Sequence, residues 1–188
     1  MYCKPILDIY PRFIPLVTIF FNFAFSKSYP TPELNSFCIM GNNKEKQYQF
    51  DTRYLEMARI WSTNSYCKRR QVGALIVKDR MIISDGYNGT PSGFENECED
   101  ENNHTKPYVL HAEANAITKV AKSNNSSEGS TLYITASPCL ECAKLIIQAG
   151  IIRVVYADDY RITDGIELLK KANVEVVQIN HVNNENSK

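Results

Sequence analysis

The chain has 188 residues, of which 44% are hydrophobic and 22% are charged, the balance of an ordinary soluble protein with room for one domain. Its formal net charge is zero, and its dense basic patch is the triplet Lys68-Arg69-Arg70. Because binding a long nucleic acid depends on neutralising many phosphates, this composition argues against such a partner and favours one small phosphorylated ligand.

Residues 1–47 differ in composition from the rest of the chain. They contain five of the eight prolines and six of the eight phenylalanines, without a clear helical or strand period. The apolar run from Phe13 to Phe25 is shorter than the roughly 20 residues that cross a bilayer. A signal peptide is one interpretation. We favour another, in which residues 1–47 are an extension, disordered or not native, and Met40 is the true start, so that residues 1–39 are absent from the functional protein.

A single domain is expected over residues 48–182, followed by a polar tail over residues 183–188. Asp51 is the predicted cap of a helix that ends near residues 62–65. Two β-rich runs with a short polar connection predict a hairpin. A glycine-rich loop and an acidic, exposed segment follow the hairpin. These segments are, in order, residues 72–77, 81–85, 86–94 and 95–106.

The second half of the domain alternates strands and helices. Helices are expected over residues 111–122, 139–149 and 163–172, and strands over residues 131–135, 151–156 and 174–179. Strands that alternate with helices are typical of a parallel arrangement with right-handed crossovers. Together with the hairpin, the pattern predicts an α/β fold with a five-stranded mixed sheet in three layers, α/β/α.

A candidate metal site lies at the start of two predicted helices. His111-Ala112-Glu113 opens one helix, and Pro138-Cys139-Leu140-Glu141-Cys142 opens the other. An imidazole and two thiolates are ligands that zinc prefers, and three protein ligands leave a position for water, as catalytic zinc requires. The positive end of a helix also favours the thiolate forms of Cys139 and Cys142.

Glu113 lies two residues from His111 and can reach the open side of the metal without being a ligand. The order H-x-E followed by P-C-x-x-C is typical of zinc-dependent nucleobase deaminases. A redox-active C-x-x-C pair would leave His111 and Glu113 unexplained, and a zinc ribbon needs a second C-x-x-C, which the sequence lacks. A C-x-x-C pair in a chain of this size also predicts a reducing compartment.

With VGALIV, GYNGTPSGF, HAEANAI and SPCLECAKLIIQAGI, the chain resembles the deoxycytidylate (dCMP) deaminases of the cytidine-deaminase-like superfamily from about Tyr48 to Ile179. The resemblance implies zinc on His111, Cys139 and Cys142, and proton transfer by Glu113. It also implies substrate contacts by Asn88 and Ala112, although Asn88 suits an ordinary turn as well.

Three further expectations concern the basic segment, Ser92 and a second metal site. Arg69 and Arg70, with Lys68, are candidates for the 5′-phosphate because of their charge and their place before the first strand. Ser92 stands where many family members have arginine, which weakens any inference of regulation by nucleoside triphosphates. Relatives with a second zinc suggest a further metal site on Cys67, Cys98 and His104, with free thiols as the alternative.

The resemblance implies hydrolysis of dCMP to dUMP and ammonia, which supplies the precursor of dTMP, by a cytoplasmic homo-oligomer with dCTP and dTTP as effectors. We expect Glu113 to accept a proton from zinc-activated water as it attacks C4, and then to protonate N3 and the departing amine. The alternatives are another zinc deaminase, acting on cytidine, a tRNA base or guanine, and a non-catalytic competence-type zinc protein. Zero net charge argues against tRNA, and an intact Glu113 argues against the non-catalytic protein. No membrane partner is expected.

Overall fold

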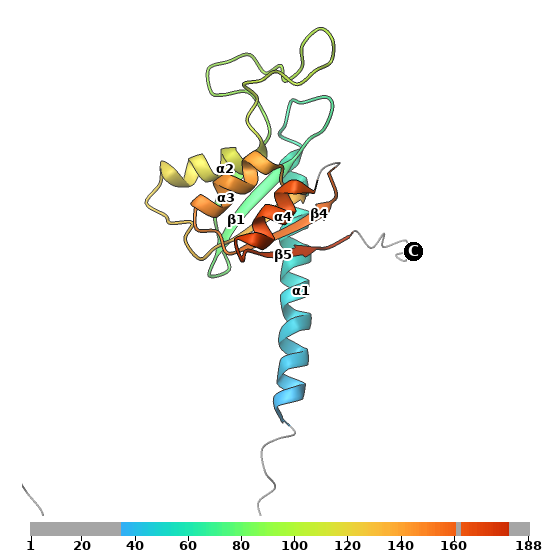
Figure 1. Cartoon of the computed structure of the whole chain (residues 1–188), viewed down its shortest axis with the longest axis vertical. Coiled ribbons are helices and arrows are strands. Elements are labelled where there is room, and N and C mark those ends of the chain that lie inside the picture. The colour runs from blue at the N-terminus through green and yellow to red at the C-terminus, as the bar shows by residue number, and fades with distance from the viewer. Residues whose placement is uncertain (1–34, 161–162, 181–188) are drawn as a thin grey trace, which may run out of the picture.

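The computed structural model describes residues 35–160 and 163–180 (Figure 1), so residues 1–34 of the predicted extension and the polar tail lie outside the described residues. Within them, the helices are α1 (Asn35–Ser62), α2 (Ala112–Ala121), α3 (Leu140–Gln148) and α4 (Asp164–Lys171). The strands are β1 (Gly73–Lys78), β2 (Met81–Tyr87), β3 (Thr131–Ala136), β4 (Arg153–Asp158) and β5 (Glu175–Gln178). None of these helices has the length and apolar character that crossing a membrane requires.

The five strands form one mixed sheet in the order β2-β1-β3-β4-β5. Strand β1 is antiparallel to both β2 and β3, whereas β3, β4 and β5 are parallel to one another. Helices α3 and α4 are the crossovers between the parallel strands, as the alternating pattern predicts. The predicted five-stranded mixed sheet is therefore confirmed.

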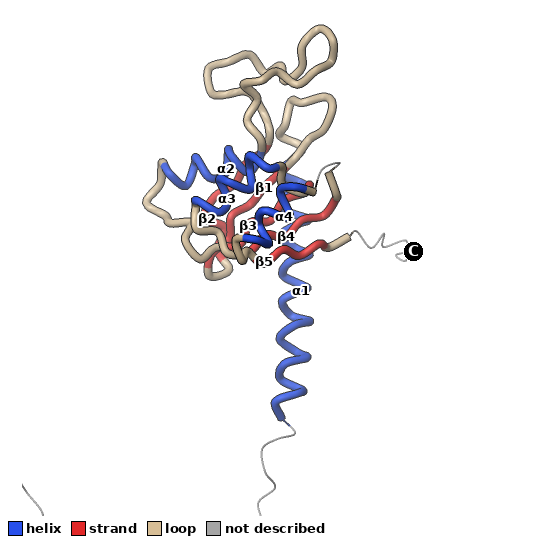
Figure 2. The backbone as a smooth tube through the Cα atoms, in the orientation of Figure 1, coloured by secondary structure: helices blue, strands red, loops and turns tan. Residues whose placement is uncertain are grey.

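Helices lie on both faces of the sheet (Figure 2), and an apolar layer lies between the helices and the sheet on each face. On one face, Leu55 and Ala58 of α1 pack against Leu75, Tyr133 and Val155. On the other face, α2, α3 and α4 pack against the alternate residues of the same strands, which are Ala74, Ile76, Leu132, Ile134, Val154 and Tyr156. Because neighbouring residues of a strand point to opposite faces, these central strands are apolar at nearly every position. The three-layer architecture follows from that pattern.

Helix α2 approaches the sheet unusually closely at Gly86. A side chain at this position would collide with the backbone of Ala112 and Ala116. Glycine at the end of β2 therefore allows the first turn of α2 to lie directly on the sheet. This contact fixes the height above the sheet at which His111 and Glu113 begin the helix.

The structure corrects the predicted start of the first helix, because α1 begins at Asn35 rather than after Asp51. The segment before Asp51 is rich in lysine, glutamate and glutamine, which are good helix formers even without an apolar face. An exposed helix of this kind shows no hydrophobic period, so periodicity alone does not reveal it. The end of α1 at Ser62 is as predicted.

Asp51 is a buried anchor in the middle of α1, not a helix cap. Its carboxylate accepts hydrogen bonds from both terminal nitrogens of Arg153, each at 2.8 Å, and from the hydroxyl of Tyr133, also at 2.8 Å. Burial raises the pKa of Asp51, but the bonds from Arg153, Tyr133 and Gln47 outweigh burial and leave this pKa below its usual value. Asp51 therefore joins α1 to strands β3 and β4 as an ion.

Replacing Asp51 with Ala should lower the free energy of unfolding by about 3 kcal/mol, because it leaves the largely buried guanidinium of Arg153 without its main partner. Urea denaturation followed by circular dichroism measures this change. The matched control is Glu175→Gln, since Glu175 also pairs with Arg153 but is 62% exposed, and it should cost less than about 1 kcal/mol. Equal effects of the two replacements would contradict the anchoring role of Asp51.

Candidate metal centre and pocket

His111 and Glu113 are placed by a short pairing between the loop after β2 and the residue before α2. Gly89 and Leu110 exchange both backbone hydrogen bonds, at 3.0 and 2.8 Å. This bridge brings the chain back to the end of the sheet, where His111 is the N-cap of α2 and Glu113 lies in its first turn. His111 is exposed, whereas Glu113 is only 3% exposed. The imidazole of His111 is therefore open to solvent, while the carboxyl group of Glu113 is buried in the protein.

The two cysteines come from the start of α3, directly after the carboxyl end of β3. Cys139 is the N-cap of this helix and is half-buried, and Cys142 is buried one turn later. Both sulfurs approach Nδ1 of His111, at 3.5 Å from Cys139 and 3.4 Å from Cys142. The three predicted ligands therefore converge from two helix starts.

This geometry fits a zinc ion. Bonds of about 2.3 Å to sulfur and about 2.0 Å to nitrogen, at tetrahedral angles, separate a nitrogen from a sulfur by about 3.5 Å. The observed separations agree with that value, and the three ligand atoms all lie within 4.8 Å of one another. One imidazole and two sulfurs form an incomplete tetrahedron, which is the ligand set of a catalytic rather than a structural zinc.

The two thiols are strongly coupled to each other. Hydrogen bonds from Cys142 and from His111 lower the pKa of Cys139 to about 3, whereas the bond to Cys139, with burial, raises the pKa of Cys142. The bond to Cys139 also raises the pKa of His111, against the effect of burial. Without a metal, these opposite shifts favour the thiolate form of Cys139 and the thiol form of Cys142. A cation that binds both sulfurs must displace the proton of Cys142.

Glu113 is a buried carboxyl group beside the metal ligands. Burial raises its pKa to about 7, an effect that a hydrogen bond from the backbone N–H of Glu113 and the charge of His111 only partly offset. Among the described residues, no lysine or arginine forms an ion pair with Glu113. A carboxyl group whose two protonation states have similar free energies near neutral pH is suited to accepting and returning protons.

His111, Cys139 and Glu113 border a cavity of about 460 Å³, whereas the third predicted ligand, Cys142, does not line it. His111, Ala112, Glu113 and Cys139 line it together with apolar residues, which are Val72, Val109, Ile134 and Ala136. Arg69, Arg70 and Asn88 line the same cavity, whereas Lys68 does not. The structure thus brings together the residues predicted for metal, proton transfer and substrate, except that Lys68 lies apart.

Asn88 lines the pocket, but its amide group is bonded to the protein. The side-chain oxygen accepts a hydrogen bond from the backbone N–H of Val72 at 2.8 Å, and the side-chain nitrogen donates to the carbonyl of Arg70 at 2.9 Å. Asn88 therefore holds the segment of the two arginines against the glycine-rich loop. Its contact with a nucleotide stays a prediction.

Tyr160 and Asp159 also line the pocket, although neither is predicted from the sequence. The guanidinium of Arg70 lies 5.7 Å from the centre of the Tyr160 ring and 3.7 Å from a carboxylate oxygen of Asp158. Asp159 and Tyr160 directly follow β4, which is parallel to its neighbour β3. Because ligands of open α/β sheets bind beyond the carboxyl ends of the strands, the position of this loop was the signal that could have identified them.

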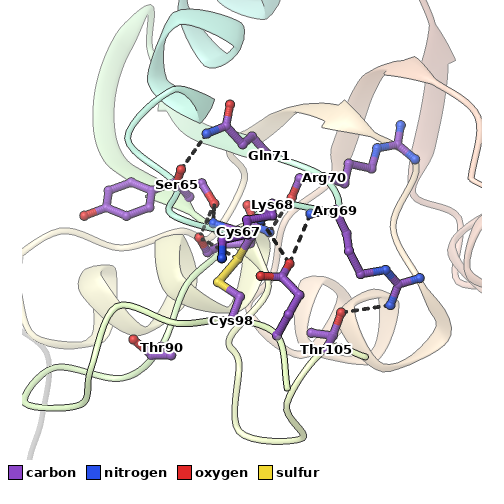
Figure 3. Close-up of a disulfide and its surroundings, with 12 residues drawn as sticks. Ser65, Cys67, Lys68, Arg69, Arg70, Gln71, Thr90, Cys98 and Thr105 are labelled. Atoms are coloured by element: carbon purple, nitrogen blue, oxygen red, sulfur yellow. Dashed lines mark hydrogen bonds between the residues drawn. A yellow bond between two sulfur atoms is a disulfide. The ribbon is translucent and has the colours of Figure 1, made fainter. Parts of the chain in front are cut away.

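The structure corrects the predicted second metal site. Cys67 and Cys98 are joined in a disulfide (Figure 3), and a disulfide provides no thiolate ligands. His104 is 76% exposed on its side chain and lies beside Asp100, 3.8 Å from its carboxylate. The only cluster of metal-ligating side chains found among residues 35–160 and 163–180 is that of His111, Cys139 and Cys142.

Residues 48–158 match the model of a protein family described as the cytidine and deoxycytidylate deaminase zinc-binding region. Among solved structures, the chain is similar to the dCMP deaminase of cyanophage S-TIM5 in complex with dCMP and dUMP. That similarity has a TM-score of 0.68 and 49% sequence identity, and it covers 70% of this chain and 97% of the phage chain.

The chain is also similar in sequence to two proteins that carry different names. ComE operon protein 2 of Bacillus subtilis is 38% identical over 132 residues, which are 67% of this chain and 69% of that protein. Deoxycytidylate deaminase of Saccharomyces cerevisiae is 34% identical over 154 residues, 73% of this chain. The match covers 49% of the yeast protein, so this chain spans about half of the length of that relative.

Purified protein should contain about one zinc ion per chain, and Cys142→Ser should lose it, because a serine hydroxyl is a poor zinc ligand. Metal analysis by inductively coupled plasma mass spectrometry measures the content. The matched control is the double variant Cys67→Ser/Cys98→Ser, which removes two sulfurs outside the site and should keep the zinc. Loss of zinc in this control, or its retention in Cys142→Ser, would contradict the assigned ligands.

Proposed function

Because this chain belongs to the cytidine and deoxycytidylate deaminase zinc-binding family, we propose that it hydrolyses dCMP to dUMP and ammonia. The observation that carries the proposal is one cavity lined both by His111, Glu113 and Cys139 and by a pair of arginines. The first group suits the deamination of a base, and the arginines suit the phosphate of a nucleotide. The product dUMP is the precursor of dTMP.

His111, Cys139 and Cys142 would hold the zinc through one nitrogen and two sulfurs. Zinc bound there supplies Lewis acidity that makes water a nucleophile at neutral pH. The two helix starts contribute to this site because their positive ends stabilise the thiolates. Pro138, which is fully buried, holds the start of α3 against the end of β3 without needing a hydrogen bond for a backbone N–H.

Glu113 carries the protons of the reaction. Its carboxylate accepts a proton from the attacking water while the water oxygen forms a bond to C4 of cytosine, and it returns that proton to N3. Glu113 then moves the second proton of the water to the amino nitrogen on C4. The C4–N bond breaks, ammonia leaves, and C4 keeps the oxygen as the carbonyl of uracil. Water and dCMP are thereby converted to ammonia and dUMP, and Glu113 ends in its starting state.

The shape and charge of the pocket favour a nucleotide over a polynucleotide. A cavity of about 460 Å³ has the size of a site for a small molecule, and its apolar walls suit a base. Arg69 and Arg70 provide two positive charges, as many as the negative charges of one 5′-phosphate. The zero net charge of the chain argues against tRNA as the substrate.

The alternatives are deamination of cytidine, a tRNA base or guanine, and a non-catalytic role of the competence type. The similarity to ComE operon protein 2 is the reason to test the non-catalytic role. The buried Glu113 argues against it, since a zinc with only a structural role needs no proton carrier. Ammonia release from dCMP, cytidine and a tRNA anticodon stem distinguishes these alternatives.

Three further proposals rest on the family resemblance. We propose that the protein acts in the cytoplasm, where nucleotides are made and where burial of Cys67 and Cys98 shields their disulfide from reductants, that it forms a homo-oligomer, and that dCTP and dTTP act as effectors. Analytical ultracentrifugation, and dCMP turnover with and without the two triphosphates, test the last two.

Replacing Glu113 with Gln should lower kcat for dCMP by at least about a hundredfold while zinc stays bound, because the amide cannot accept and return a proton. Ammonia release together with zinc content measures both effects. Glu141→Gln is the matched control, since Glu141 lies between the two cysteines in sequence but is exposed and pairs with Lys144. This control should keep its activity. Turnover retained in Glu113→Gln would remove Glu113 from the mechanism.

Arg69→Ala and Arg70→Ala should each lower kcat/KM for dCMP by about 10- to 100-fold, because each removes a charged hydrogen-bond donor from the phosphate. Deoxycytidine lacks the phosphate, so its kcat/KM should stay within about twofold. Lys68→Ala is the control from the same basic patch, because Lys68 does not line the cavity. Equal losses for dCMP and deoxycytidine would show that the arginines do not act on the phosphate.

A further inference from the structure

A small closed turn lies beside the two arginines. Glu99 and Thr105 pair with each other as an isolated β-bridge, and the chain reverses between them. Asp100 closes the turn, because its side-chain oxygen accepts hydrogen bonds from the backbone N–H groups of Asn102 and His104, at 2.9 and 2.8 Å. The turn is therefore an ordered element whose two base residues, Glu99 and Thr105, stand side by side.

Both base residues contact Arg69, and Figure 3 shows the contact of Thr105. The Oε1 atom of Glu99 accepts hydrogen bonds from the backbone N–H groups of Lys68 and Arg69, at 3.0 and 3.1 Å. The hydroxyl of Thr105 accepts a hydrogen bond from Nη1 of Arg69 at 3.2 Å. Arg69 is thus held at its backbone by one residue of the bridge and at its guanidinium by the other.

The disulfide fixes this arrangement in register. Cys67 and Cys98 precede Lys68 and Glu99, so the covalent link and the bonds of Glu99 join neighbouring positions of the same two segments. Cys67 is 4% exposed and Cys98 is 1% exposed. The turn therefore cannot slide along the basic segment without breaking both connections.

Arg70 is held by different groups. It lies beside Asp158 and over the ring of Tyr160, which belong to β4 and the loop that follows it. The two pocket arginines consequently have separate supports. Changes in the turn over residues 99–105 should affect Arg69 and leave Arg70 in place.

We propose that Glu99 and Thr105 are positioning residues that hold Arg69 for the 5′-phosphate of the substrate. A free arginine side chain must lose its rotational freedom when it binds an anion. An arginine ordered by its neighbours has lost that freedom on folding, so its bond to the phosphate is stronger. Thr105 uses one N–H of the guanidinium, which leaves four donors for the phosphate. This inference rests on the proposed function, because it assigns a role to the same pocket.

The test compares Glu99→Ala and Thr105→Val with the wild-type protein on dCMP and on deoxycytidine. Each variant should raise KM for dCMP by about tenfold, with kcat within about twofold, and leave kcat/KM for deoxycytidine unchanged. Glu99→Gln and Thr105→Ser keep an oxygen that accepts the hydrogen bonds, so they should restore most of the affinity for dCMP. Glu101→Ala is the control, because it removes an exposed acid from the same turn, and it should match the wild type.

The results separate this proposal from the proposed function. Unchanged KM for dCMP in both variants, or equal losses on dCMP and deoxycytidine, would overturn the positioning role. If Arg69→Ala also fails to distinguish the two substrates, the assignment of the phosphate to Arg69 is wrong as well. If the wild type releases no ammonia from dCMP, the proposed function itself is wrong. Thermal unfolding checks that each variant is folded. If Glu99→Ala does not fold, Thr105→Val still tests the proposal.

Discussion

The chemistry of this protein depends on the meeting of two helix starts at one end of the sheet. His111 and Glu113 come from the first turn of α2, and Cys139 and Cys142 come from the first turn of α3. Neither helix carries a complete site, so the ligand set exists only when both pack on the same face. Gly86 and the bridge between Gly89 and Leu110 set the position of α2, and β3 sets that of α3. The apolar layer between the sheet and these helices therefore fixes the distances among the ligands.

The sequence was sufficient to predict the fold class, the sheet and the convergence of His111, Cys139 and Cys142, with Glu113 beside them. The reason is that each of these features is written in local patterns. Buried central strands require continuous apolar runs, and helices over them require apolar residues at helical spacing. The metal ligands sit at fixed offsets from helix starts, so H-x-E and P-C-x-x-C locate them without knowledge of the tertiary contacts.

Features that depend on contacts between distant segments could not be predicted from the sequence. Asp51 looks like a helix cap, but its partners Arg153 and Tyr133 lie 102 and 82 residues away along the chain. Cys67 and Cys98 could be read as metal ligands or free thiols, because spacing does not reveal which sulfurs lie in bonding distance. The exposed part of α1 over residues 43–49 and the pocket residue Tyr160 likewise carry no periodic signal.

The pocket combines residues on packed helices with residues on loops. The reaction centre stands on helices packed against the core, where small displacements are resisted by dense packing. The residues proposed for the phosphate stand on loops, and their positions depend on hydrogen bonds, the Arg70–Asp158 ion pair and one disulfide. Loops tolerate substitutions that a core does not. It follows that changes in the turn over residues 99–105 can alter the proposed binding of the phosphate while the deamination step proposed for Glu113 and the three ligands stays the same.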